Sequence, residues 1–367
     1  MKILFVLPGL HRHNRGAETA FIAIASELAK LGNTVTLMGS GPTRAGVPYR
    51  YMKIPSLARE NFESFPSIPP LRSEYVYEEL TFVPGLLSLY RPMDYDVTLT
   101  CSYPFINWCL RRPVLRGSRP PHVFVTQNAD WPAYDDQAEY RFFGCDGLVC
   151  INPEFFERNK DHWRCVLIPN GVDCNLFRPG GAQRQVFGLP EDRPVVLMVS
   201  ALIPNKRVDR GVAAVSRIPH AHLVVAGDGP LRHNIDALAS RLLPGRFSRI
   251  TVAPEQMSAL YKSADVFLHL AKEESFGNIY LEALACGIPI VAHDSPRLRW
   301  IVGEHAFLAD TENEAVIAQQ ITRARNVSPA QRQSGVSRAQ NFSWPKIGQM
   351  YQAFLQVVVG SIAPSGN

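Results

Sequence analysis

Residues 195–230 read VVLMVSALIPNKRVDRGVAAVSRIPHAHLVVAGDGP, two short apolar runs that enclose a helical stretch. The runs Val195–Val199 and Leu223–Ala226 are rich in β-branched residues and bounded by turn residues, which predicts strands. We expect further strands at Ile250–Val252, Val266–Leu270 and Ile290–Ala292, again with helical stretches between them. Such alternation predicts a doubly wound parallel sheet with helices on both faces.

The first half of the chain shows the same alternation. Ala17–Leu31 has apolar residues at helical spacing and ends at Gly32, a residue that favours a helix stop. The expected strands here are Lys2–Leu7, Thr34–Met38, Val97–Cys101, His122–Thr126, Leu148–Ile151 and Val166–Ile168. At 367 residues the chain exceeds the size that one core usually reaches, so the sequence predicts two facing Rossmann-like domains of the α/β class.

A turn-rich segment at 169–181 interrupts the alternation, and we expect the domain boundary there, between residues 180 and 181. Two facing sheets of this kind form a cleft at the carboxyl ends of their strands, where open α/β sheets bind ligands. Between Ile54 and Tyr90 the pattern is poor and proline-rich, which predicts long loops that serve recognition.

Composition and charge favour a cytoplasmic protein with no nucleic-acid partner. The net charge of +5 is modest, and no apolar run reaches the roughly 18 residues of a membrane-spanning helix. The run Ile3–Leu7 is too short for a secretion signal, and the seven cysteines show neither disulfide nor zinc spacing. One basic cluster follows an apolar stretch and is either a peripheral contact with anionic lipid or an ordinary surface: Arg111, Arg112, Arg116 and Arg119.

The most specific motif is ESFGNIYLEA at residues 274–283, directly after the expected strand ending at Leu270. A helix beginning near Phe276 would direct its free backbone amides into the cleft. Glu282 would lie about two turns beyond Glu274, so the two carboxylates would reach different parts of one elongated ligand. An acidic helix start that stabilises the helix dipole explains Glu274 alone, but it leaves Glu282 unexplained among apolar neighbours.

The pattern ExFGxxxxEA resembles the signature of retaining glycosyltransferase family 4, which has the GT-B fold. Other segments resemble motifs of this family in the same order, and together they span nearly the whole chain. They are Arg15–Glu18, Ile168–Asp173 with Phe177 and Pro179, Asn205–Asp209, and Val224–Pro230.

The resemblance implies a role for each matching residue. Glu282 would bind the ribose of the nucleotide, and Glu274 a hydroxyl of the donor sugar. Lys206 would neutralise the departing diphosphate, for which its place between a strand and a helix is suited. The backbone amides of Phe276, Gly277 and Asn278 would bind the sugar and phosphate. Gly16 would let the backbone approach the donor phosphates closely. Gly227 would either shape a turn near the nucleotide or serve turn geometry alone.

Two departures from the family pattern matter. Ser200 and Ala201 replace the usual Gly-Arg, so a phosphate arginine is absent; Arg207 is a candidate replacement, although it need not face the same way as Lys206. Where many members carry a histidine, this chain has Gln127 and Asn128, whose amides are candidates for the sugar contact. Asp130 is either an acid or base, or a helix cap.

The resemblance implies transfer of a hexose, with UDP-glucose as the first donor to consider, to a glycan or lipid-linked acceptor in polysaccharide or glycoconjugate synthesis. Domain 181–344 would bind the nucleotide sugar, and domain 1–180 the acceptor, with a C-terminal helix 345–360 crossing back to it. No cofactor or metal is expected, because the Asp94/Asp96 pair precedes a strand, whereas a metal site should follow one. A nucleotide-sugar epimerase of the same fold is the alternative.

Overall fold

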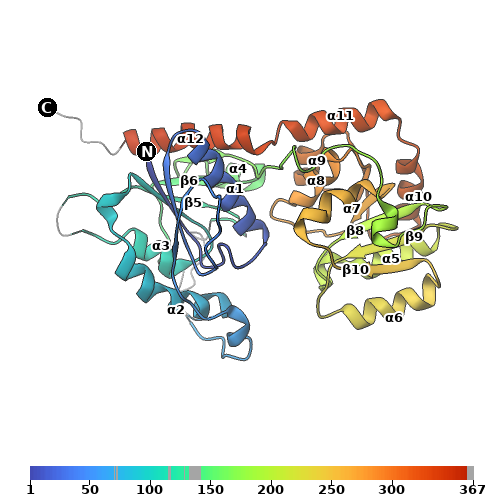
Figure 1. Cartoon of the computed structure of the whole chain (residues 1–367), viewed down its shortest axis with the longest axis horizontal. Helices are drawn as coiled ribbons and strands as arrows, with labels where there is room; N and C mark the ends of the chain where they lie inside the picture. The colour runs from blue at the N-terminus through green and yellow to red at the C-terminus, as the bar shows by residue number, and fades with distance from the viewer. Residues whose placement is uncertain (70, 72, 115–116, 128, 132–141, 362–367) are drawn as a thin grey trace. The chain divides into compact units, whose positions relative to one another are not determined.

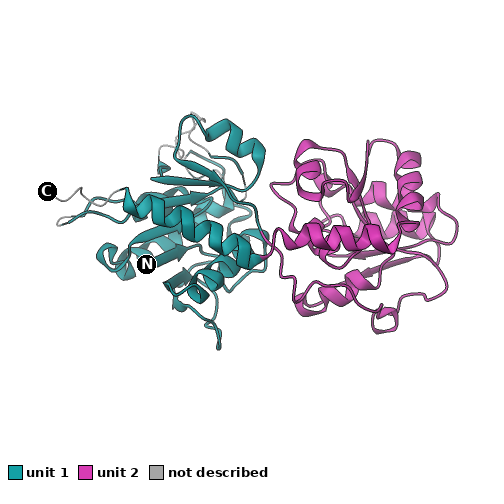
Figure 2. Ribbon diagram, turned by 90° about the horizontal axis from the view of Figure 1, so that it is seen from above, with its two compact units in different colours: residues 1–170, 344–367 teal, residues 171–343 magenta. Residues whose placement is uncertain are grey.

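The computed structural model of the chain describes residues 1–69, 71, 73–114, 117–127, 129–131 and 142–361. The chain forms two compact units, shown in teal and magenta in Figure 2: unit 1 comprises residues 1–170 and 344–367, and unit 2 comprises residues 171–343. The division thus lies at 170/171 and 343/344, which is ten residues before the first expected boundary at 180/181 and one residue before the second at 344/345. Each unit is described by itself below.

Unit 1 is built on a seven-stranded sheet in the order β3-β2-β1-β4-β5-β6-β7 (Figure 1). All neighbouring strands run parallel. The strands are β1 Lys2–Val6, β2 Thr34–Gly39, β3 Arg50–Lys53, β4 Val97–Thr100, β5 His122–Val125, β6 Gly147–Cys150 and β7 Cys165–Leu167. Six of them lie where the sequence predicts strands, and β3 is an addition at the sheet edge.

Helices cover this sheet, and one of them corrects an expectation. The segment 54–90, expected to form long loops, contains the short turn η1 (Arg59–Phe62) and the sixteen-residue helix α2 (Glu74–Leu89). The other described helical segments of unit 1 are α1 Gly16–Lys30, η2 Pro92–Asp94, α3 Pro104–Leu110, α4 Pro153–Asn159 and α12 Trp344–Gly360.

The last helix, α12, packs against α1 within unit 1 (Figure 1). The two helices approach closely at Gly348, where an added β-carbon would lie 2.6 Å from the β-carbon of Glu27. Beyond the end of α1, Asn33 Nδ2 donates to Gln352 Oε1 at 2.5 Å. The segment that follows unit 2 therefore completes the core of unit 1.

Unit 2 carries a second parallel sheet, of six strands in the order β10-β9-β8-β11-β12-β13. The strands are β8 Val195–Val199, β9 His222–Ala226, β10 Phe247–Ile250, β11 Val266–His269, β12 Ile290–His293 and β13 Ala306–Ala309. The helical segments are η5 Arg184–Phe187, η6 Pro204–Lys206, α5 Val208–Ser216, α6 Arg232–Leu242, η7 Pro254–Gln256, α7 Met257–Lys262, α8 Asn278–Ala285, α9 Pro296–Val302, α10 Glu314–Arg325 and α11 Pro329–Gln340.

The two parallel α/β sheets confirm the predicted fold class. In unit 2 the buried faces of β8, β9 and β11 form the centre of the core, with side chains such as Val196, Leu223 and Leu268 fully buried. Because every strand of this sheet points the same way, the loops that follow β8, β9, β11 and β13 emerge at one edge. Among the described residues, no helix has the length and apolar character needed to cross a membrane.

Candidate functional site

Lys206 and Glu274 come together at the carboxyl edge of the unit 2 sheet. Lys206 ends η6, after β8, and Glu274 lies in the loop after β11, the strand beside β8. The Lys206 ammonium donates to Glu274 Oε1 in a short contact. Both side chains remain accessible, at 18% and 22% exposure, so a ligand can reach the pair.

His269 is a third member of this group, and the motif analysis did not include it. It ends β11, is 1% exposed, and its Nε2 lies 3.0 Å from Glu274 Oε1. Burial lowers the pKa of His269, which favours a neutral ring that donates through Nε2. Burial alone would raise the pKa of Glu274, but the His269 hydrogen bond and the Lys206 ammonium together lower it to about 2. The Glu274 side chain is therefore ionised at neutral pH.

Glu282 occupies a different electrostatic environment. It lies on α8, and Tyr261 on α7 donates its hydroxyl to Glu282 Oε2 at 2.9 Å. Burial raises the pKa of Glu282 to about 7, and the hydrogen bond from Tyr261 offsets only part of that rise. This carboxyl group therefore accepts a proton near neutral pH.

The helix between the two glutamates starts close to the expected position. Helix α8 begins at Asn278, two residues after Phe276, so the amides of Phe276 and Gly277 precede its first turn. Gly277 adopts φ +87°, and a β-carbon there would lie 2.6 Å from the Tyr280 ring. Phe276 is buried, with its ring 6.4 Å from that of Trp300. Gly277 is thus required by local geometry, whatever ligand its amide binds.

Gly227 and Arg207 also have local structural explanations. A β-carbon on Gly227 would lie 2.0 Å from the carbonyl oxygen of Ser200, so the close approach of two loops alone demands glycine there. The Arg207 guanidinium is directed at Thr311, with Nη1 donating to Thr311 Oγ1 at 2.6 Å. Arg207 and Lys206 therefore contact different partners, although they are neighbours in sequence.

The predicted site residues Gln127 and Asp130 make hydrogen bonds with other residues of unit 1. Gln127 and Asn170, both buried, exchange amide hydrogen bonds of 2.8 and 3.0 Å. Asp130 accepts from Arg158 at 2.5 Å and from Asn159 at 2.9 Å, so its carboxylate ties α4 to the loop after β5. Asn128 lies outside the described residues.

Among the described residues, no neighbour of Gly16 requires a glycine there. Gly16 opens α1, and an added β-carbon would lie within 4 Å of no described atom outside its chain neighbours and its own helix backbone. The space beside the first amides of α1 remains open to a ligand, as the close-approach role requires.

Two of the four arginines in the basic cluster, Arg111 and Arg119, are engaged inside unit 1. Arg111 Nη2 donates to the Phe142 carbonyl at 2.7 Å, and Arg119 makes two contacts with Asp146, at 2.6 and 3.0 Å. Arg116 lies outside the described residues. The engaged guanidinium groups of Arg111 and Arg119 weaken the case for a lipid contact at this cluster.

The Asp94/Asp96 pair lies at the amino ends of the strands. Asp96 Oδ2 accepts from the backbone amide of Lys2 at 2.7 Å, at the start of β1. This is the opposite end of the sheet from the loops in which open α/β folds bind ligands. Within the described residues, no group of three or more His, Cys, Asp and Glu side chains is placed to hold a metal ion.

Comparison with known proteins adds two family matches and several relatives. The family model "Glycosyltransferase Family 4" matches residues 14–176, and the model "Glycosyl transferases group 1" matches residues 181–338. The D-inositol 3-phosphate glycosyltransferase of Mycolicibacterium smegmatis is 32% identical over 201 residues, which are 51% of this chain and 46% of that protein. The chain therefore spans less than half the length of this curated relative.

Solved structures similar to this chain share its fold over almost their full length. A sucrose-phosphate synthase from Thermosynechococcus elongatus has a TM-score of 0.79 at 20% identity, covering 98% of this chain and 99% of that one. Anabaena HepE in complex with UDP-glucose has a TM-score of 0.73 at 18% identity, covering 97% and 100%. Since the two family models between them match most of the sequence, the chain belongs to glycosyltransferase family 4.

Proposed function

We propose that this chain is a retaining glycosyltransferase that moves a hexose from a nucleotide diphosphate sugar, most simply UDP-glucose, to a glycan or lipid-linked acceptor. Such a reaction serves polysaccharide or glycoconjugate synthesis and fits a cytoplasmic enzyme. The observation that carries the proposal is the convergence of Lys206 and His269 on Glu274, at the carboxyl edge of a parallel sheet. Family membership supports it further.

In the proposed reaction, each group has a distinct task. Lys206 would turn from Glu274 to the diphosphate as negative charge develops on the leaving group, where a preplaced cation is most effective. His269 and Lys206 both contact Glu274 Oε1, which leaves Oε2 to accept from a hydroxyl of the donor sugar. Glu282, with its raised pKa, would bind the ribose hydroxyls.

The nucleotide is proposed from similar proteins. The Anabaena structure is described as a complex with UDP-glucose, which makes this donor the first to test. The mycobacterial relative is named for D-inositol 3-phosphate, which adds a phosphorylated polyol to the acceptors worth testing beside glycans. We also propose that transfer needs no divalent metal, because Lys206 supplies positive charge at the leaving group.

A thermal-shift screen of UDP-glucose, GDP-mannose and ADP-glucose tests the donor. A ligand at 100 times its Kd stabilises the folded state by about 2.7 kcal/mol, which is readily measured as a higher melting temperature. We expect UDP-glucose to give the largest shift. The proposal fails if none of the nucleotide sugars changes the melting temperature.

Incubation with the stabilising donor then separates transfer from epimerisation. A transferase should release nucleotide diphosphate faster when an acceptor is supplied, whereas an epimerase converts the donor without one. Sugar analysis after incubation with donor alone distinguishes the two, and a new donor epimer in that sample would favour the epimerase.

A further inference from the structure

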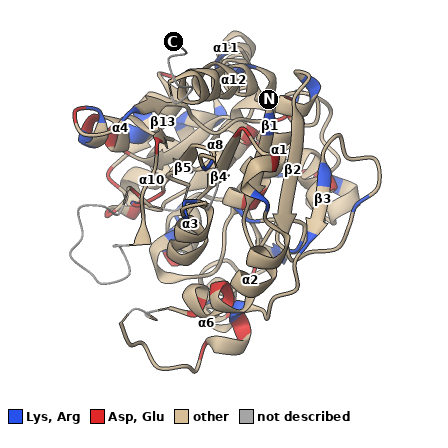
Figure 3. Cartoon of the chain, turned by 90° about the vertical axis from the view of Figure 1, so that its left-hand side faces the viewer, with Lys and Arg blue, Asp and Glu red and all other residues tan. Residues whose placement is uncertain are grey.

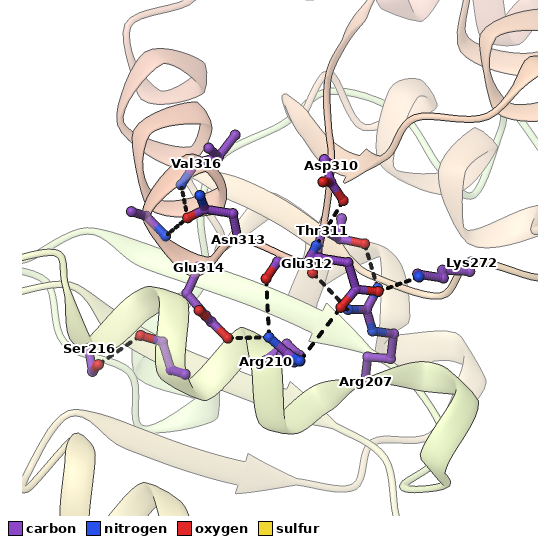
Figure 4. A network of polar contacts seen from close by, with 12 residues as sticks. Arg207, Arg210, Ser216, Lys272, Asp310, Thr311, Glu312, Asn313, Glu314 and Val316 are labelled. Carbon is purple, nitrogen blue, oxygen red and sulfur yellow. Dashed lines mark hydrogen bonds and ion pairs between the residues drawn. The ribbon is translucent and has the colours of Figure 1, made fainter.

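Glu312 lies among three cationic side chains of unit 2 (Figure 4). It belongs to the loop between β13 and α10, and its side chain is 47% exposed. Its Oε2 lies 3.0 Å from Arg207 and 3.6 Å from Arg210, and its Oε1 makes a short contact with the Lys272 ammonium. One carboxylate therefore joins groups from two other segments of the chain.

Those two segments are the ones that carry the Lys206–Glu274 pair. Arg207 directly follows Lys206, and Lys272 precedes Glu274 by two residues. Glu312 thus connects the Lys206 turn to the Glu274 loop through the neighbours of both residues. A cavity of about 500 Å³ lies beside these side chains, and its lining includes Arg207, Lys272 and Glu312.

Arg207 has an unusual backbone conformation at the point where Glu312 contacts it. Arg207 has φ +55°, a left-handed conformation that is unfavourable for a residue with a β-carbon. Its guanidinium is bound by Thr311 Oγ1, by the Thr311 carbonyl at 2.8 Å and by Glu312. The β13–α10 loop therefore contacts the Arg207 side chain directly beside Lys206, at a residue with an unfavourable backbone conformation.

We propose that Glu312 is a positioning residue that keeps the Lys206 turn and the Glu274 loop in place through Arg207 and Lys272. The proposal rests on the proposed function for what the Lys206–Glu274 pair does with a donor. Glu312 itself has no contact with that pair and takes no part in chemistry.

Glu314 provides a matched control two residues away. Its carboxylate pairs with Arg210 at 2.5 Å, at the first residue of α10, and both residues lie on helices rather than on the two loops. Glu314→Gln and Glu312→Gln each remove one negative charge from the same surface. A general electrostatic effect would be alike in both variants, whereas positioning requires only Glu312→Gln to disturb the loops.

Hydrogen–deuterium exchange of the full chain measures the loops without any ligand. In Glu312→Gln we expect exchange to rise about three- to tenfold at residues 271–277, the range for losing a partly exposed ion-pair network. The rise at 204–208 should be smaller, because Thr311 still holds Arg207. About 0.5 M salt should move the wild type towards the variant, because exposed charges are screened.

Two further variants sharpen the test. Arg207→Gly permits the same positive φ but removes the guanidinium, so it should raise exchange at 204–208 without unfolding the chain. Glu314→Gln should leave both loops as in the wild type. Unchanged exchange at 271–277 in Glu312→Gln, or an equal rise in Glu314→Gln, overturns the proposal.

Titration calorimetry with UDP adds the functional readout. We expect Glu312→Gln to weaken UDP binding about three- to tenfold and Glu314→Gln to change it less than about twofold. Equal UDP affinity in wild type and Glu312→Gln counts against positioning. A wild type that binds no UDP contradicts the proposed donor instead, and the exchange comparison still decides the role of Glu312.

Discussion

Two glutamates eight residues apart respond oppositely to their surroundings. Burial raises the pKa of Glu282 to about 7, whereas His269 and Lys206 lower that of Glu274 to about 2 in spite of burial. Near neutral pH the charge on Glu282 is therefore unfavourable to the fold and the charge on Glu274 is favourable. Replacing Glu282 by glutamine therefore removes a destabilising charge, whereas replacing Glu274 by glutamine removes a stabilising one.

We predict that Glu282→Gln stabilises the folded protein at pH 8 while weakening UDP binding. The folded-state pKa lies above the ordinary 4.5, so wild-type stability falls as the pH rises from about 4.5 through 7. One pKa unit corresponds to about 1.4 kcal/mol, so we expect a gain of about 1–3 kcal/mol at pH 8 and none below pH 4. Urea unfolding across this range and UDP titration give the two measurements. A loss of stability at pH 8 together with unchanged UDP affinity would refute both assignments.

We predict that Glu274→Gln destabilises the folded protein near neutral pH and leaves UDP binding nearly unchanged. Its folded-state pKa lies below 4.5, so its contribution to stability is present above that pH and is lost as the pH falls towards 2. We expect a loss of about 1–2 kcal/mol at pH 7, little change in UDP affinity and a large fall in turnover. Unfolding at pH 7 and donor-consumption rates test this. Turnover close to that of the wild type would remove Glu274 from the reaction.

At the scale of elements, the contact of α12 with α1 depends on one glycine. Gly348 is buried against Glu27, whereas Gly360, at the end of the same helix, has open space around it. We predict that Gly348→Leu destabilises the chain by about 2 kcal/mol or more, because the added side chain forces the helices apart. Gly360→Leu is the matched control and should change stability by less than about 0.5 kcal/mol. Similar melting temperatures for the two variants would contradict this packing.

Most strands of the fold were predictable because their apolar residues are continuous, but β13 was not expected, and β10 shares only Ile250 with the expected strand Ile250–Val252. Helix α2 escaped prediction since its buried positions include Glu78 and Glu79 and its interior contains Pro84, which mask the helical pattern. Strand β3, Arg50–Lys53, is a partly exposed edge strand that begins and ends in charged residues. Its strand character depends on pairing with β2, which local sequence does not report.

The candidate site was predictable in its motifs but not in its contacts. Glu274, Glu282 and Lys206 stand out in sequence, whereas His269 is one polar residue in a strand of apolar neighbours. A histidine at the last position of a strand that enters the site was the available signal. The direction of Arg207 depends on Thr311, more than one hundred residues away, and so could not be inferred from its neighbours.

At the scale of the whole molecule, the net charge of +5 is modest, and acidic and basic residues occur together on single elements. Helices α4 and α6 each carry both kinds (Figure 3). The Asp94/Asp96 pair lies at the amino end of β4, away from the loops that follow the strands. The positive charge nearest Glu274 is the Lys206 ammonium.

We therefore predict that transfer is independent of divalent metal. Activity in about 5 mM EDTA should remain within twofold of that without it, because Lys206 provides the charge that a metal ion would otherwise supply. Donor turnover before and after chelation measures this, with added magnesium and manganese as separate samples. Loss of activity in EDTA that manganese restores would show the expectation to be wrong.

The two passages of the chain between the units lie side by side. The amide of Val172 donates to the Phe342 carbonyl at 2.9 Å, and the residues before 171 and after 343 both belong to unit 1. Unit 2 is therefore an insertion whose two ends are joined by a hydrogen bond. A domain with adjacent ends can be removed from a protein, or inserted into another, without distorting the domain that carries it. A fragment of residues 171–343 should fold cooperatively by itself and retain UDP binding through Lys206 and Glu282. Calorimetric melting and UDP titration of the fragment would show whether unit 2 folds and binds the donor nucleotide without unit 1.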